Sequence, residues 1–144
     1  MFTLNLGCGN DYIDGAVNVD MNEDVKCDMV LDIENDKFPW INGTVDQIIA
    51  KHVVEHIWKR DQFMNKCWEV LKCGGTMYIE TPTAGTVAYW KDPTHVSGWI
   101  EQTFKYYAEW NTCPANQRKT WKIRKIETVL KGDENEHIIC ILEK

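Results

Sequence analysis

The feature that most constrains the fold is the apolar run Phe2–Leu6, which ends abruptly in the glycine-containing turn Gly7–Asn10. A short, continuous apolar run is typical of a strand buried on both faces, as in a parallel sheet. Glycines directly after such a strand permit a tight turn and a close approach of the backbone to a ligand. The start of the chain therefore predicts a first strand with a candidate binding turn at its carboxyl end.

Six further strands are predicted from short apolar runs. They are Ala16–Asp20, Met29–Asp32, Val45–Ala50, Thr76–Glu80, Trp121–Leu130 and Glu136–Leu142. The first two strands are separated by so few residues that we expect their crossover to be a turn or a very short helix. The polar link Lys131–Asn135 favours an antiparallel hairpin of the last two strands.

Two helices are predicted between these strands. Over Trp58–Leu71, apolar residues recur every four positions, as on one face of an amphipathic helix, and Gly74 and Gly75 are expected to end it. A second helix is expected over Glu101–Trp110. Strands alternating with crossovers indicate an α/β fold with a seven-stranded, mostly parallel sheet and a C-terminal antiparallel hairpin.

Composition and net charge indicate how many domains the chain forms and which class of partner it binds. A chain of 144 residues with 44% hydrophobic residues is suited to one domain, spanning residues 1–144. The net charge of −6 is the opposite of the basic excess of nucleic-acid-binding proteins, so small molecules or proteins are the expected partners. No pattern specifies an oligomeric state.

The six cysteines form no C-x-x-C pair and do not cluster with histidines at zinc spacing, so we expect no metal site. Because the chain begins directly with the strand and glycine turn, we expect no secretory signal and a cytoplasmic protein. No apolar stretch approaches the roughly 20 residues that span a bilayer, so no membrane association is expected.

Polar residues follow several predicted strands. Because ligands of such sheets bind outside the carboxyl ends of the strands, Gly7–Asn10, Asp20, Asp32 and His52 should converge on one crevice. Asp20 could accept hydrogen bonds from the vicinal diol of a ribose or could cap a loop. Asp32 could accept from an amine of adenine, with Ile33 against the ring, or could cap the next turn.

A dinucleotide-binding fingerprint is incomplete here. Tyr12 stands where a third glycine would be required, and Asp20 comes too early for the acidic residue of that motif. A nucleotide- or NAD-dependent enzyme is therefore the weaker interpretation.

Several motifs occur in order: LNLGCGN, VNVD, MVLDIEN, FPW before VDQII, HVVEHI and EVLKCGGTMYIETP. In this order the chain resembles the class I S-adenosylmethionine-dependent methyltransferases, from about Leu4 to Pro82, as a minimal member with a Rossmann-like fold. The later segment DPTHV, followed by Thr103 and Phe104, resembles a subgroup of these proteins.

The resemblance implies roles for individual residues toward S-adenosylmethionine and its product S-adenosylhomocysteine. It places the glycine turn, including Cys8 and Gly9, against the methionine part and Asp20 at the ribose. It places Asp32 with Ile33 at the adenine, and His52 with Val53 at the methyl-donating end. The full set of expected cofactor-binding residues is Gly7, Cys8, Gly9, Asn10, Asp20, Asp32, Ile33, His52 and Val53.

Two histidines are the candidate catalytic residues. A hydroxyl acceptor would gain from a general base, for which histidine is suited. His52 follows a strand of the crevice and His95 lies in a loop able to cover it, whereas His56 more simply braces the start of a helix. The expected function is methyl transfer to a small molecule, a sugar or a protein side chain. Because the first crossover is short and no extra helices cover a substrate, the alternative is a noncatalytic module that binds S-adenosylmethionine or S-adenosylhomocysteine.

Overall fold

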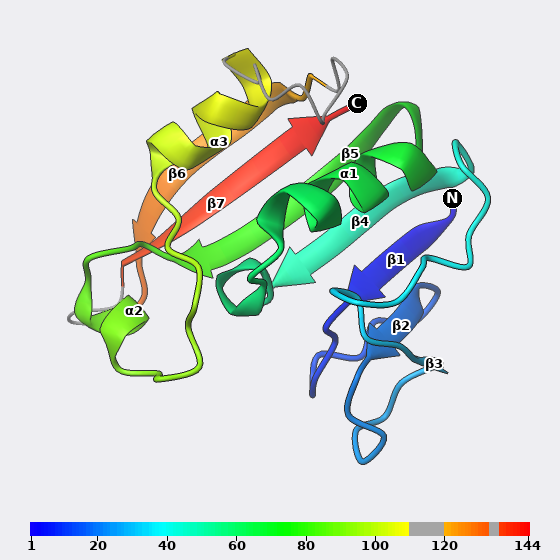
Figure 1. Cartoon of the computed structure of the whole chain (residues 1–144), viewed down its shortest axis with the longest axis horizontal. Helices are drawn as coiled ribbons and strands as arrows, with labels where there is room; N and C mark the ends of the chain where they lie inside the picture. Colours follow the sequence, from blue (N-terminus) through cyan, green and yellow to red (C-terminus); the bar gives the residue numbers. More distant parts are fainter. Residues whose placement is uncertain (110–119, 133–135) are drawn as a thin grey trace.

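A seven-stranded sheet forms the centre of the molecule (Figure 1). The computed structural model describes residues 1–109, 120–132 and 136–144. The strands lie in the order β3-β2-β1-β4-β5-β7-β6. Their bounds are β1 Thr3–Leu6, β2 Val17–Asp20, β3 Met29–Val30, β4 Val45–Lys51, β5 Leu71–Pro82, β6 Lys122–Leu130 and β7 Glu136–Glu143. Strands β1 to β5 pair in parallel, and β7 is antiparallel to both of its neighbours. The predicted mostly parallel sheet with a closing antiparallel hairpin is confirmed.

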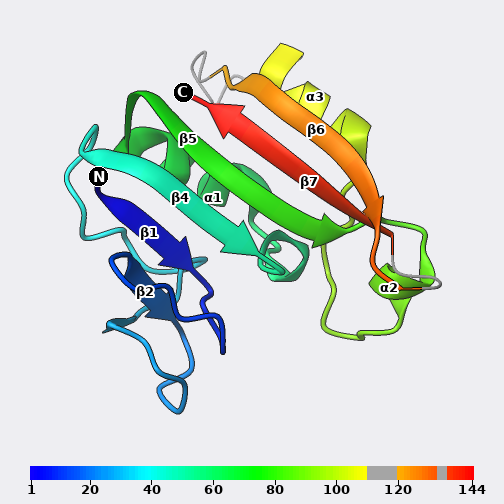
Figure 2. The ribbon, with the colours of Figure 1, turned by 180° about the vertical axis from the view of Figure 1, so that it is seen from behind.

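The longer helices cover one face of this sheet. Helices α1 (Arg60–Val70) and α3 (Glu101–Glu109) lie on the face turned to the viewer in Figure 1. Seen from behind in Figure 2, the strands lie in front and none of the described helices covers them. Helix α1 buries Phe63, Met64 and Cys67 in the core, which confirms the predicted apolar face. Short helices α2 (Val87–Trp90) and η1 (Val54–His56) follow the carboxyl ends of β5 and β4.

The end of α1 differs from the prediction. Leu71 is already extended, and Gly74 and Gly75 lie inside β5 rather than capping the helix. The reason is pairing with the end of the chain, because Gly74 N–H donates to Lys144 O at 2.9 Å and Lys144 N–H donates to Gly75 O at 3.0 Å. The strand expected over Thr76–Glu80 therefore begins five residues earlier.

The first crossover contains no helix, as predicted, and a buried asparagine holds it. Asn18 is fully buried in β2. Its Oδ1 accepts from Asn5 Nδ2 at 2.9 Å and from Ile13 N–H at 2.8 Å, and its Nδ2 donates to Ile13 O at 3.0 Å and to Asp28 Oδ2 at 2.9 Å. One satisfied amide thus fixes the loops around Ile13 and Asp28 to β1 and β2.

The strand order reverses between β1 and β4, which places a switch point beside the Gly7–Asn10 turn. In the described ranges, none of the helices has the length and apolar character needed to cross a membrane. Trp110, expected to end α3, and residues 133–135 of the predicted hairpin link lie outside the described residues.

Candidate functional site

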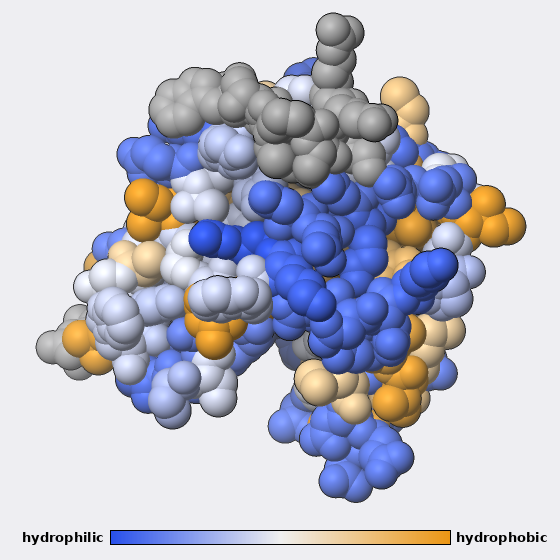
Figure 3. Space-filling view, in the orientation of Figure 1, coloured by the Kyte–Doolittle hydropathy of each residue, from blue (hydrophilic) through white to orange (hydrophobic). Residues whose placement is uncertain are grey.

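A cavity of about 470 Å³ opens at the carboxyl ends of β1, β2, β3 and β4. In the space-filling view the lower edge of the molecule is notched between the part around α2 and the part formed by β2 and β3 (Figure 3). The cavity lies within the size range of ligand pockets in enzymes. Its lining residues are Gly7, Gly9, Asp20, Met21, Leu31, Asp32, Ile33, Glu34, Asn35, His52, Val53, His56 and Ile57.

The glycine turn after β1 leaves its backbone accessible to a ligand. Gly7 and Gly9 have φ angles of 62° and 48°, in the left-handed region that favours glycine. A Cβ atom on Gly7 would lie 2.5 Å from Val53 Cγ2, so Gly7 is required for packing against the loop after β4. A Cβ on Gly9 would meet no atom within 4 Å and would project into open space, so this position can receive a ligand against its backbone.

Asp20 lies at the end of β2 and is fixed by two backbone groups. Its Oδ2 accepts from Gly9 N–H at 2.8 Å, and its Oδ1 accepts from Asn22 N–H at 2.9 Å. Each oxygen has a second lone pair, because a carboxylate can accept about four hydrogen bonds. The arrangement orients a carboxylate that lines the cavity and can still accept from a diol.

Asp32 mainly holds the loop after β3. Its Oδ1 accepts from the backbone N–H groups of Glu34 and Asn35, and its Oδ2 accepts from Asn35 Nδ2 at 2.9 Å. The Asn35 side-chain and backbone hydrogen bonds lower the pKa of the Asp32 carboxyl. These hydrogen bonds give Asp32 the predicted role of capping the turn. The next residue, Ile33, is buried and lines the cavity.

Lys66 anchors the same loop from α1, a role that the sequence analysis missed. Its Nζ donates to the carbonyl oxygens of Ile33, Glu34 and Asp36 at 2.6, 3.0 and 2.9 Å. Burial lowers the pKa of the Lys66 ammonium. Three backbone acceptors therefore compensate for its desolvation and fix the loop that carries Ile33.

His52 is held between two buried carboxylates just after β4. Its φ of 54° is the one left-handed value of a non-glycine residue in the described part of the chain. Its Nδ1 lies 3.4 Å from Glu55 Oε1, and its Nε2 lies 3.3 Å from Glu80 Oε1. Interaction with Glu55, opposed by burial and supported by Glu80, raises the pKa of His52. Backbone strain of this kind gathers at functional sites, which makes His52 the strongest candidate for chemistry.

His95 lies apart from the cavity lining. Its side chain is 6% exposed, and its Nδ1 lies 2.6 Å from Tyr89 O. Its ring contacts the ring of His56 with centroids 4.8 Å apart, and His56 in turn lines the cavity. His56 braces the loop before α3 rather than the start of α1, because its Nδ1 contacts the carbonyl oxygen of Thr94 at 3.2 Å.

The cavity contains every predicted cofactor-binding residue except Cys8 and Asn10. Those two line an adjoining cavity of about 390 Å³ on the other side of the glycine turn. The other lining residues were not predicted to bind the cofactor, although most are sequence neighbours of Asp20, Asp32 or His52. Glu80 was not predicted either, because its contact with His52 joins distant parts of the chain and leaves no local pattern.

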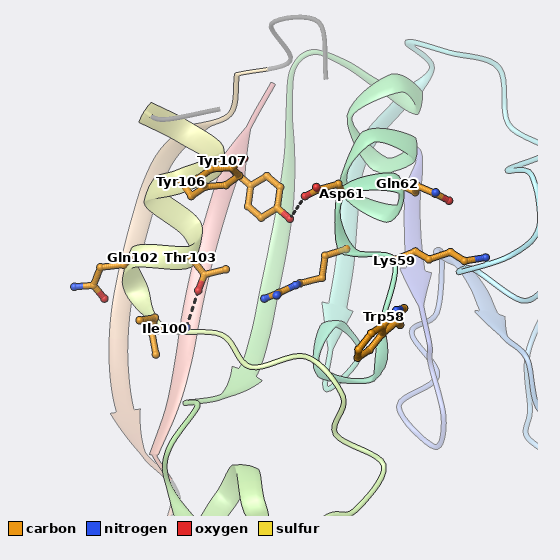
Figure 4. A pocket seen from close by; sticks show the side chains of 10 residues that line it. Trp58, Lys59, Asp61, Gln62, Ile100, Gln102, Thr103, Tyr106 and Tyr107 are labelled. Carbon is orange, nitrogen blue, oxygen red and sulfur yellow. Dashed lines mark hydrogen bonds between the residues drawn. The ribbon is translucent and has the colours of Figure 1, made fainter. Parts of the chain in front are cut away.

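A separate cavity of about 760 Å³ lies between α1 and α3 and shares no lining residue with the first. Figure 4 shows the Tyr107 side chain reaching across it, where the hydroxyl donates to Asp61 Oδ1 at 2.7 Å. Tyr106 and Tyr107 line this cavity, and Tyr107 also belongs to the core together with Trp99 and Phe104.

A family model and a sequence relative both indicate a methyltransferase domain. A family model described as a methyltransferase domain matches residues 4–79. A probable S-adenosylmethionine-dependent methyltransferase of Mycolicibacterium smegmatis is 32% identical over 56 residues, which are 39% of this chain and 22% of the relative. The matched segment thus spans about a fifth of the length of that relative.

Solved structures share the whole fold. An S-adenosylmethionine-dependent methyltransferase from Archaeoglobus fulgidus superimposes with a TM-score of 0.71 at 19% identity, covering 99% of this chain and 85% of that one. A putative methyltransferase from Haloferax volcanii was solved in complex with a methyltransferase activator. It superimposes with a TM-score of 0.74 at 12% identity, covering 99% of this chain and 81% of that one.

The family match contains the glycine turn, Asp20, Asp32 and His52, and it extends over more than half of the chain. The sheet order and the solved relatives give the same assignment for the fold. The chain therefore belongs to the methyltransferase domain family of class I S-adenosylmethionine-dependent methyltransferases.

Proposed function

We propose that this chain transfers the methyl group of S-adenosylmethionine to a hydroxyl of a small molecule, a sugar or a protein side chain. The observation that carries the proposal is Asp20, a carboxylate fixed by Gly9 and Asn22 on the wall of the cavity. In this proposal Asp20 accepts from the ribose hydroxyls. The glycine turn receives the methionine part, with Cys8 and Asn10 on its far side.

The same lining residues support the proposed positions of the adenine and methyl ends of the cofactor. Ile33 packs against adenine, and Asp32 shapes the loop that presents Ile33. Val53, packed on Gly7, and His52 lie at the methyl-donating end. When bound, S-adenosylmethionine supplies a methyl group on a good leaving group, so the protein mainly aligns the acceptor.

His52 is proposed as the proton acceptor for the hydroxyl. Of the two predicted catalytic histidines, it is the one that lines the cavity, and its side chain is 46% exposed. Glu55 and Glu80 flank its two nitrogens and stabilise the imidazolium that forms when it takes a proton. His95, the other predicted catalytic histidine, does not line the cavity, and its ring contacts the lining residue His56.

The alternative function is a binding module without turnover. Two observations favour it: the first crossover has no helix, and no described helix covers the second face of the sheet. Such a chain would hold the adenosyl group but would leave an acceptor poorly enclosed.

A turnover assay separates these functions. The full chain is incubated with S-adenosylmethionine and with hydroxyl-bearing small molecules, sugars and peptides, and release of S-adenosylhomocysteine is measured. We expect acceptor-dependent release, and we expect His52→Asn to lower kcat by about 10²–10⁴ while it weakens S-adenosylhomocysteine binding far less. Tight binding without release on any acceptor class would support the binding module instead.

A further inference from the structure

Three side chains with metal-binding atoms meet beside the cofactor cavity. Glu55 and His56 come from η1, and His95 comes from the loop between α2 and α3. One ligand atom from each lies within 4.8 Å of the other two. His56 and His95 are 39 positions apart in sequence, so the spacing of cysteines and histidines did not predict this group.

Glu55 supplies a carboxylate oxygen that lacks a hydrogen bond. The residue is fully buried, and its Oε2 accepts from Thr81 Oγ1 at 3.0 Å. Its Oε1 is buried without a hydrogen-bond partner in the described structure, since His52 Nδ1, at 3.4 Å, does not meet hydrogen-bond geometry. Protonated His52 offers this buried oxygen only an ion pair at 3.4 Å, and a bound cation would satisfy it at coordination distance.

The tautomer of His56 leaves Nε2 free. Thr94 Oγ1 donates its proton to Asp92 Oδ1 at 2.6 Å, because a carboxylate can only accept. The Thr94 hydroxyl therefore has no proton for His56, whose Nδ1 lies 3.1 Å from that oxygen and 3.2 Å from the Thr94 carbonyl oxygen. Nδ1 must be the donor, and neutral His56 keeps a lone pair on Nε2.

The tautomer of His95 is fixed in the same way. Its Nδ1 lies 2.6 Å from Tyr89 O, an acceptor, so the neutral ring carries its proton on Nδ1 and its lone pair on Nε2. A metal-binding histidine commonly donates its other N–H to a backbone carbonyl, which orients the ring. Asp92 Oδ2 lies 3.6 Å from His95 Nε2 and adds negative charge at this end of the group.

We propose that Glu55, His56 and His95 bind one divalent first-row transition-metal ion. Two imidazoles and one carboxylate suit zinc or iron(II) and leave coordination positions open. This proposal departs from the expectation, based on cysteine spacing, that the chain holds no metal. Because His56 also lines the cofactor cavity, the ion would place positive charge beside the acceptor and favour a hydroxyl oxygen. That last consequence rests on the proposed function, whereas the site itself does not.

The test is calorimetric titration of the chelator-treated full chain with Zn²⁺, without S-adenosylmethionine. We expect one ion per chain, with affinity lowered by roughly tenfold or more in Glu55→Gln and in His56→Ala, since even outer-sphere partners contribute 10–100-fold. His56 is exposed but contacts Thr94 and His95, so circular dichroism is used to verify that His56→Ala keeps the fold.

One control variant defines the site. Cys73→Ser removes an exposed thiol that is not among the proposed ligands and should leave Zn²⁺ affinity unchanged. No binding by the unmodified chain, or affinity lost in Cys73→Ser but kept in His56→Ala, would overturn the proposal. Because the readout is metal binding alone, failure here leaves methyl transfer standing, and failure of methyl transfer leaves this site standing.

Discussion

Gly9 and Asp20 are joined across the ends of β1 and β2 by a hydrogen bond of 2.8 Å from Gly9 N–H to Asp20 Oδ2. This bond couples the turn that receives one part of the cofactor to the carboxylate proposed to hold its ribose. Asp20→Ala should weaken the binding of S-adenosylhomocysteine by roughly 1.5–3 kcal/mol, because a charged hydrogen-bond acceptor is lost. Calorimetry on Asp20→Ala, with the exposed Asp24→Ala as the matched control, checks this. Equal affinity in both variants would show that the ribose is held elsewhere.

Gly9→Ala tests whether the open space at this turn receives the cofactor. Gly43 is a matched control, because it also has a positive φ, 71°, and open space around its Cβ position, but it does not line the cavity. Both substitutions should destabilise the fold by about 1–2 kcal/mol through backbone strain. Only Gly9→Ala should also weaken S-adenosylhomocysteine binding in calorimetry. A similar loss of affinity in Gly43→Ala would mean that strain alone causes it.

Lys66→Met tests the loop that presents Ile33. Lys66 touches backbone oxygens and acts on the cofactor only through that loop, so it is a positioning residue. We expect S-adenosylhomocysteine binding to weaken by about 0.5–1.5 kcal/mol, the contribution of an ordinary hydrogen bond. The control is Lys72→Met, because Lys72 pairs with Asp46 at 2.7 Å, away from the cavity lining. Unchanged affinity for S-adenosylhomocysteine in Lys66→Met would show that the loop carrying Ile33 does not contribute to cofactor binding.

The contacts of His52 predict a pH-dependent contribution to stability. Its pKa is raised in the folded chain, so this contribution is fully present below the unfolded pKa of about 6.5 and is lost as pH rises through the folded value. His52→Asn removes the imidazole, and asparagine tolerates the left-handed backbone. Urea unfolding from about pH 6 to 9 should show the difference between the two proteins shrinking with rising pH. A constant difference would contradict the contacts with Glu55 and Glu80.

Local sequence patterns were sufficient to predict the strands and the glycine turn. The apolar run before Gly7 and the acidic residues after β2 and β3 are contiguous signals, and a parallel sheet brings its carboxyl ends to one edge. Most of the predicted cofactor-binding residues therefore line one cavity. The bounds of β5 were less accurate, because the pairing of Gly75 with Lys144 joins residues 69 positions apart.

Tertiary contacts explain what the sequence did not reveal. His52 acquires its environment from Glu80 on β5, and His56 meets His95 from a distant loop. Asp32 carried two possible roles in sequence; its hydrogen bonds to Glu34 and Asn35 give it the capping role, and its place in the cavity lining keeps the adenine role a prediction. These outcomes depend on side-chain geometry, on which hydrophobic periodicity carries no information.

If the cavity beside Gly9 and Asp20 binds the adenosyl cofactor, as we propose, S-adenosylhomocysteine should protect the chain against thermal and chemical unfolding. At about a hundredfold excess over its Kd, S-adenosylhomocysteine should stabilise the unmodified chain by about 2.7 kcal/mol. NAD should stabilise it much less, and Asp20→Ala should respond weakly to either ligand. No stabilisation by S-adenosylhomocysteine, or equal stabilisation by both ligands, would contradict the account.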